Sequence, residues 1–150
     1  VPGSPAPGES DNSLAAEIAI RELLLSDETI YSLIGVRVYP VVTPQNPSFP
    51  MVVYGLRNTE RLSHIAGSEN IANKTIRIDA YAESYAAVKS VSEAVSRLLH
   101  GYAGTIVLGE DSIKFTMILL EEESDSEPVL IRPGSDEFVY AVNMAFNVWY

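Results

Sequence analysis

The chain has 150 residues, of which 47 % are apolar and 20 % charged, and this length and composition favour one globular domain with a packed core. The absence of cysteine excludes disulfides, zinc–thiolate sites and thiol nucleophiles. Ten Lys and Arg against twenty Asp and Glu give a net charge of −10, which opposes tight binding to a phosphate backbone.

Residues 1–12, VPGSPAPGESDN, combine three prolines and two glycines and carry no large apolar side chain after Val1. Such a segment cannot bury enough surface to offset the entropy of ordering, so we expect a flexible arm. The arm is either a passive linker or an assembly arm that orders on a neighbouring subunit. We expect residues 13–150 to form a single domain. The chain lacks the long apolar run of a membrane span and the features of a signal peptide, so no membrane partner is expected.

Two helices are predicted at the start of this domain. An apolar stripe at helical spacing follows Ser13, and Ser26 is the predicted N-cap of a second, short helix over Asp27–Ile34 that Gly35 ends. The residues of the first stripe are Leu14, Ile18, Ile20, Leu24 and Leu25. The next segment, Val36–Pro40, predicts a brief edge strand, because the prolines that follow exclude a central one. Residues 41–50 are expected to form an extended loop.

A long β-hairpin is predicted next, from the alternating runs 51–60 and 74–82. In the second run Ile76, Ile78 and Ala80 share one face, which is expected to be buried. The thirteen residues between the runs, 61–73, are too many for a tight turn, so this loop is a candidate contact surface. Its candidate interface residues are Arg61, Leu62, His64, Ile65, Asn70 and Ile71.

The second half predicts one helix and three strands. The helix begins at Glu83 and Ser84 and ends at His100 and Gly101, and the strands cover 104–108, 113–120 after a turn at 109–112, and 137–150. The helix's apolar face comprises Tyr85, Val88, Val91, Val95, Leu98 and Leu99, and that of the last strand comprises Phe138, Tyr140, Val142, Met144, Phe146 and Val148. The predicted class is therefore α+β, with a mainly antiparallel sheet packed by two principal helices.

Residues suited to catalysis or cofactor binding are scarce. His64 and His100 each stand without a nearby acid or second histidine at metal-ligand spacing. The acidic residues Glu121, Glu122, Glu123, Asp125 and Glu127 lack the pattern of a calcium loop, so a solvated loop is favoured over a cation site. No glycine pattern predicts a phosphate cradle and no serine a nucleophile elbow. We expect no cofactor, no metal and no enzyme activity.

The order of elements, together with RVYP at 37–40, FPMVVYGL at 49–56 and TIRIDAYA at 75–82, resembles the tail-completion (tail-terminator) family of tailed phages. The resemblance runs from about Leu14 to Tyr150. It implies a structural virion protein of the tail and neck, assembled in the host cytoplasm. Such a subunit forms a ring, usually hexameric, that caps the tail tube, ends its polymerisation and offers a surface for head–tail joining. The implied partners are further copies of the chain, the major tail tube protein and a head–tail connector or stopper protein.

Within that resemblance, the loop 61–73 is the expected contact with the neighbouring subunit or the tube, and Glu121, Glu122 and Glu123 are candidates for lining the bore. DNA would pass an acidic bore without specific binding, because like charges repel. Two other hypotheses stay open at this point. One is another head–tail connector or tail-tube subunit; the other is a stand-alone binding or catalytic domain, for which the sequence offers no concave site with reactive groups.

Overall fold

The structure is a computed structural model that describes residues 9–61, 72–130, 134 and 136–150. The elements, in chain order, are α1 (Glu9–Ser26), α2 (Glu28–Ile34), β1 (Val38–Pro40), β2 (Met51–Arg61), β3 (Ala72–Ala82), α3 (Tyr85–Leu99), β4 (Gly104–Leu108), β5 (Asp111–Phe115), β6 (Met117–Asp125), β7 (Val129–Leu130) and β8 (Phe138–Trp149). None of these described helices combines the length and the apolar character that crossing a bilayer requires.

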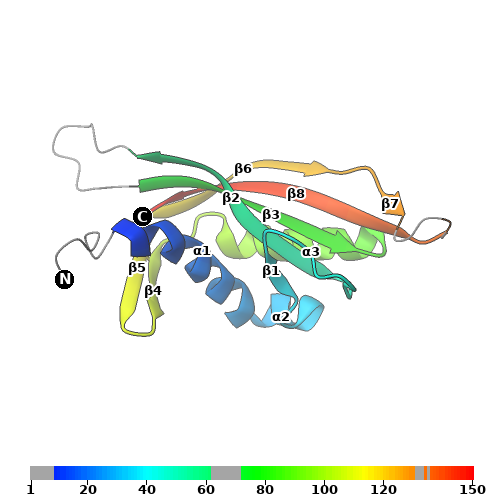
Figure 1. The fold of residues 1–150 in the computed structure, drawn as a ribbon, viewed down its shortest axis with the longest axis horizontal. Coiled ribbons are helices and arrows are strands. Elements are labelled where there is room, and N and C mark those ends of the chain that lie inside the picture. The colour runs from blue at the N-terminus through cyan, green and yellow to red at the C-terminus, as the bar shows by residue number, and fades with distance from the viewer. Residues whose placement is uncertain (1–8, 62–71, 131–133, 135) are drawn as a thin grey trace.

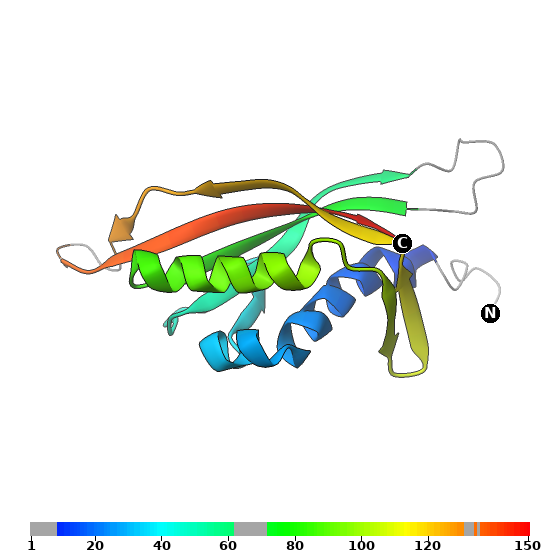
Figure 2. The same cartoon turned by 180° about the vertical axis from the view of Figure 1, so that it is seen from behind.

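A twisted sheet forms one layer, and the three helices cover one of its faces (Figures 1 and 2). Its strand order is β1-β2-β3-β8-β6, with β7 paired to the start of β8. The short β1 is parallel to β2, and every other described pair is antiparallel. β4 and β5 form a separate two-stranded sheet at one end of the molecule. The predicted α+β class with a mainly antiparallel sheet and a long β2–β3 hairpin is confirmed.

The core lies between the helices and the sheet, as the periodicities predicted. Ile76, Ile78 and Ala80 of β3 are fully buried, because alternate residues of a strand point to the same face. The helical and β8 side chains that pack in the same core include Ala16, Ile20, Leu24, Val88, Val91, Val95, Leu99, Val142, Phe146 and Val148. Four positions of the predicted apolar faces are wrong. Leu14 and Ile18 of α1 are 56 % and 39 % exposed. Tyr85 and Phe138 are 49 % and 44 % exposed, since each lies at the end of its element.

The helix boundaries differ from the prediction in two places. α1 begins at Glu9, so residues 9–12 of the predicted arm are helical, while residues 1–8 lie outside the described residues. The N-cap of α2 is Asp27 and not Ser26, because the carboxylate of Asp27 accepts a hydrogen bond from the backbone N–H of Ile30 at 3.0 Å. Gly35 ends α2 at φ +61°, in the left-handed region that glycine tolerates best.

The predicted strand over 113–120 is two strands. The chain breaks at Thr116, whose backbone N–H donates to the carbonyl of Trp149 at 2.8 Å, so that β5 stays with β4 while β6 joins the large sheet. β6 continues to Asp125, so the acidic segment predicted as a solvated loop is an edge strand with exposed side chains. Its backbone is held in the sheet by pairing with the apolar β8, which outweighs the low strand propensity of glutamate.

Candidate assembly surface

The sheet face opposite the helices carries a network of charged side chains. Arg77 Nη1 lies 2.8 Å from Asp79 Oδ2 on the same strand, and Arg57 Nη1 lies 2.8 Å from Glu122 Oε2. Because β3 and β8 separate β2 from β6, the Arg57–Glu122 pair spans two intervening strands. These residues line a hollow of about 290 Å³ together with Ser124, Asn143, Met144 and Ala145.

The charges of this network differ in burial. Asp79 is only 5 % exposed, and burial raises the pKa of its carboxyl, although the positive charge and hydrogen bond of Arg77 act in the opposite direction. Arg57 is exposed, and the hydrogen bond to Glu122 raises the pKa of its guanidinium. The Arg77–Asp79 pair is therefore part of the packed structure, whereas the Arg57–Glu122 pair remains accessible to a partner.

Two arginines anchor the loop 41–50 to the sheet. Arg77 Nη2 donates to the carbonyl of Val41 at 3.1 Å, and Arg37 Nε donates to the carbonyl of Pro50 at 2.7 Å. Val41 has φ +65°, an unfavourable conformation for a β-branched residue. The hydrogen bond from Arg77 therefore helps to hold the start of this loop in one conformation, and Arg37 holds its end.

The three glutamates predicted to line a bore do not share one face of the sheet. A register shift between Leu120 and Glu122 makes Glu121 the extra residue of a β-bulge. Glu121 accepts a hydrogen bond from Asn147 Nδ2 at 2.7 Å, and Glu122 pairs with Arg57, so both lie on the face away from the helices. Glu123 stands opposite Met144 of the core and so belongs to the helix side.

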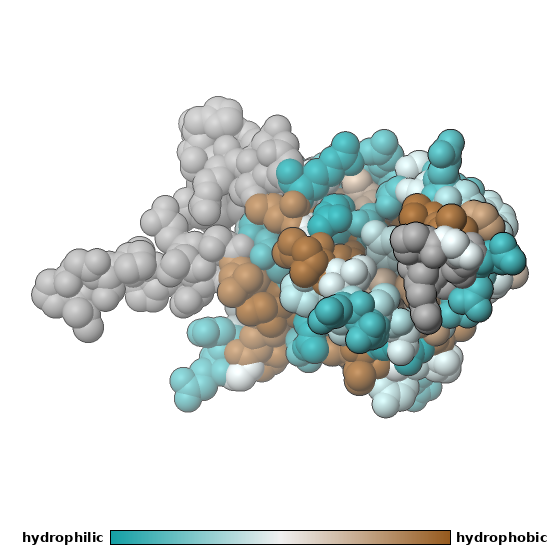
Figure 3. All heavy atoms as spheres, turned by 45° about the vertical axis from the view of Figure 1, so that its right-hand side comes forward, coloured by the Kyte–Doolittle hydropathy of each residue, from teal (hydrophilic) through white to brown (hydrophobic). Residues whose placement is uncertain are grey.

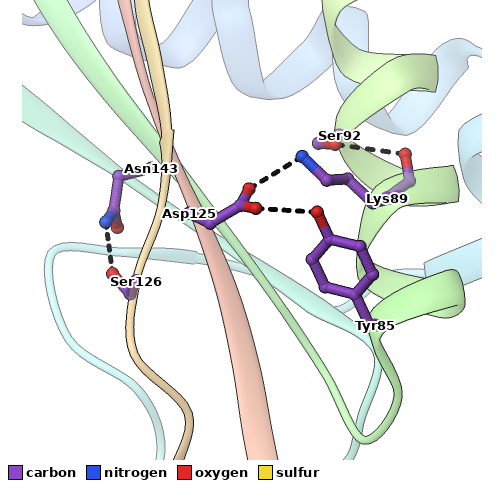
Figure 4. A network of polar contacts seen from close by, with 6 residues as sticks. All are labelled: Tyr85, Lys89, Ser92, Asp125, Ser126 and Asn143. Atoms are coloured by element: carbon purple, nitrogen blue, oxygen red, sulfur yellow. Dashed lines mark hydrogen bonds and ion pairs between the residues drawn. The ribbon is translucent and has the colours of Figure 1, made fainter.

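Asp125, at the end of β6, ties this strand to α3 (Figure 4). Its two carboxylate oxygens accept from Lys89 Nζ and from the Tyr85 hydroxyl, each at 2.7 Å. The hydrogen bonds from Lys89 and then from Tyr85 lower the pKa of Asp125, and the same contact with Asp125 raises the pKa of Lys89. On the next residue, the Ser126 hydroxyl accepts a hydrogen bond from the amide of Asn143 on β8. The exposed Tyr85 thus has a polar role in place of the predicted apolar one.

The connection after α3 covers part of the outer edge of β6. The backbone of Ile118 exchanges hydrogen bonds with Gly101 N–H (2.7 Å) and the Tyr102 carbonyl (3.0 Å), and Leu120 N–H donates to His100 Nδ1 at 2.9 Å. His100 was predicted to end the helix, and it does so as the C-cap, but its ring also caps the edge strand. Beyond Leu120 the edge carries acidic residues, which disfavour uncontrolled pairing with another strand.

The described stem of the β2–β3 hairpin ends beside the start of α1 and the C-terminal end of β8 (Figure 1). Arg61 and Ala72 are its last paired residues before the described part of the hairpin ends. Of the interface residues predicted from the sequence, only the backbone of Arg61 is described. Leu62, His64, Ile65, Asn70 and Ile71 lie outside the described residues.

Two features of the structure were missing from the sequence-based prediction. The first is a buried ion pair between Lys74 of β3 and Glu17 of α1, and the only sequence signal for it is that Lys74 falls in register with Ile76 and Ile78. The second is β7, whose apolar residues border a groove at the end of the sheet. The sequence feature that could have indicated this strand is the apolar pair Val129 and Leu130 after Pro128. In the space-filling view, apolar surface occurs as separate patches among hydrophilic residues (Figure 3).

Nothing in the described part of the chain forms a candidate metal centre, since no three His, Asp or Glu side chains there converge on one point. Three acidic residues of β6, Glu121, Glu122 and Asp125, instead contact Asn147, Arg57 and Lys89 respectively.

Proteins that are similar to this chain identify its family. The family profile described as tail completion protein gp17 matches residues 18–117, which is about two thirds of the chain. A chain in the solved structure titled "Virion of native gene transfer agent (GTA) particle" has the same fold, with a TM-score of 0.65 at 18 % sequence identity, over 91 % of this chain and 96 % of that one. No curated protein sequence is significantly similar. The chain belongs to the tail completion protein gp17 family and is a structural protein of the phage virion.

Proposed function

We propose that the protein forms a ring that caps the phage tail tube, ends tube polymerisation and provides the surface on which head and tail join. Membership of the tail completion family is the observation that carries the proposal. The partners are further copies of this chain, the major tail tube protein and a head–tail connector or stopper protein. The role is structural, with no reaction catalysed.

A ring requires that two different surfaces of one subunit fit each other on successive copies. We assign one of these surfaces, or the contact with the tube, to the hairpin loop that carries Arg61, Leu62, His64, Ile65, Asn70 and Ile71. The position of the β2–β3 stem supports this assignment, because its last described pair, Arg61 and Ala72, lies beyond Asn73 and Trp149, the last pair that joins β3 to β8 at this end. Residues 13–150 act as one domain in this proposal, and their single contiguous core supports it.

We assign the acidic edge of β6 to the bore. Glu121, Glu122 and Glu123 are all exposed and lie on β6, the edge strand of the sheet. Side chains on both faces of an edge strand lie close to the edge of the sheet, so all three could face the same bore. A negative rim would repel the phosphate backbone and let DNA pass without specific binding. The net charge of −10 is consistent with such a passage.

Light scattering on the purified protein, with and without tail tubes, tests the proposed ring. The expected result is a closed oligomer near six subunits that binds the ends of tubes and stops their growth. A protein that remains monomeric in the presence of tubes would contradict the proposal. Open-ended polymerisation would indicate a tube subunit, and binding to the head without binding to tubes would indicate a connector.

A further inference from the structure

An apolar groove lies at the end of the sheet that is farthest from the C-terminus. It measures about 550 Å³, within the usual range for sites that take small molecules or short peptide segments. One wall is the loop 43–49, and the other is formed by β7 and the start of β8. The lining residues are Thr43, Gln45, Asn46, Pro47, Phe49, Met51, Tyr81, Val129, Leu130 and Val139. Val129 and Leu130 at the rim are 65 % and 43 % exposed, although both are apolar.

The groove is held in shape by contacts already described. The loop that forms its first wall is anchored by Arg77 at Val41 and by Arg37 at Pro50, while β7 is paired to Phe138 and Val139 of β8. Both walls are therefore tied to the sheet. A preformed site loses less entropy on binding than one that must first order itself.

The chemistry of the groove fits a proline-rich peptide. Polyproline II segments dock into grooves lined by aromatic and apolar side chains, and this groove offers Phe49, Tyr81 and Pro47. The chain contains such a segment: residues 1–8 read VPGSPAPG and hold no charged side chain. Because polyproline II has three residues per turn, Pro2 and Pro5 fall on the same side of the helix, as in P-x-x-P ligands. A neutral segment also avoids repulsion by an acidic protein.

The segment that enters a given groove must come from another molecule. α1 starts beside the C-terminal end of β8, whereas the groove lies at the opposite end of that strand (Figures 1 and 2). From Val139 to Trp149, β8 spans ten residue steps, or about 33 Å. Residues 1–8 reach at most about 29 Å when fully extended, and less in polyproline II. They cannot lie along the groove of their own copy.

We propose that the groove binds residues 1–8 of a second copy of the chain in a polyproline II conformation. Each subunit would then offer its arm to one neighbour and its groove to the other, a head-to-tail contact of the kind that closes a ring. The proposal does not require that the oligomer caps a tail tube, so the two can be tested separately.

The first test uses the acetylated peptide VPGSPAPG and a variant of the protein that lacks residues 1–8. We expect saturable binding, with NMR shift changes at Phe49, Tyr81 and Val129, and a loss of about tenfold in affinity for the peptide with Pro2→Ala and Pro5→Ala. Val129→Asp in the protein should abolish binding. Its matched control is Val107→Asp, a similarly exposed valine on β4 whose substitution should leave binding unchanged.

The second test distinguishes the possible occupants. The full chain with Val129→Asp has an arm without a working groove, and the truncated protein has a groove without an arm. Each protein alone should form an oligomer of smaller mass than the wild type. A mixture of the two should form a heterodimer. The proposal is overturned if the peptide fails to bind, if it binds the Val129→Asp protein with equal affinity, or if it changes the NMR shifts of residues on another surface. A full chain that blocks the peptide yet stays monomeric would show that its own arm fills the groove, and this would also overturn it. If the peptide binds and the oligomer forms but tubes remain uncapped, only the proposed function fails.

Discussion

Lys74 and Glu17 form an ion pair 2.8 Å long in which the lysine side chain is only 2 % exposed and the glutamate side chain 15 %. The pair connects α1 to β3, and the lysine ammonium also lies 5.9 Å from the centre of the Tyr150 ring. Burying an ammonium group costs free energy unless the group is paired. This contact therefore fixes the position of α1 and of Tyr150 relative to β3 at Lys74.

Removing the glutamate of this pair should be more harmful than removing the lysine. Glu17→Ala removes a carboxylate that pairs with a buried ammonium and should lower the free energy of unfolding by roughly 3 kcal/mol. Lys74→Met replaces the cation by an apolar chain of similar length and should change stability by less than about 1.5 kcal/mol. Urea denaturation of both variants and of the double variant measures this. Equal losses for the two single variants would contradict the account.

Asp125 should contribute to the loss of stability in acid. Hydrogen bonds from Lys89 and Tyr85 lower the pKa of this carboxyl in the folded protein, so its contribution is present above the ordinary aspartate pKa of about 4 and is lost as the pH falls through the lower folded value. Asp125→Asn should therefore lose less stability than the wild type as the pH falls below about 4. Melting temperatures measured across this range check the prediction; parallel curves for the two proteins would refute it.

Asp79 should have the opposite effect on the pH dependence. Burial raises the pKa of its carboxyl, so the folded protein holds this proton to a higher pH than the unfolded chain does. Stability contributed by Asp79 therefore falls as the pH rises from about 4 through the raised folded pKa. The wild type should lose stability relative to Asp79→Asn over that interval. The slope of the stability difference between the two proteins against pH is therefore the measurement that decides.

Local patterns were sufficient to predict most of the fold. The alternation of Ile76, Ile78 and Ala80 predicted which face of β3 is buried, and the spacing of Val88, Val91 and Val95 predicted the inner face of α3. These predictions rest on backbone periodicity alone, which a single sequence displays. The family resemblance rested on short motifs within the same elements, and the matching profile over residues 18–117 confirms it.

Contacts between distant segments were not predictable in this way. The acidic residues after Leu120 have low strand propensity, and only pairing with β8 reveals that they form a strand. The Arg57–Glu122 pair joins residues 65 positions apart, and the Asp125–Lys89 pair joins residues 36 apart. The groove likewise combines the loop 43–49 with β7, two segments that no local pattern connects.

The hairpin loop should be needed for assembly and not for folding. Deleting Leu62–Asn70 should prevent ring formation or tube binding while leaving the melting temperature close to that of the wild type, since the described core is built from residues outside this segment. A variant with Leu62→Ser and Ile65→Ser keeps the length of the loop and removes its apolar anchors, so it should show the same defect. Unchanged oligomer mass and unchanged tube binding in both variants would exclude this loop as the contact surface.

Charge reversal on β6 should slow the passage of DNA if this strand faces the bore. Glu121→Lys, Glu122→Lys and Glu123→Lys together turn an exposed acidic edge into a basic one that attracts phosphate. The control variant reverses Glu22, Glu93 and Glu110, which are exposed on α1, on α3 and at the β4–β5 turn, and changes the net charge by the same amount. We expect slower DNA release and lower infectivity for the β6 variant alone, at equal ring mass and equal particle yield. Equal infectivity for the two variants would place the acidic edge outside the bore, because a passage lined by lysines must retard a phosphate backbone at physiological salt.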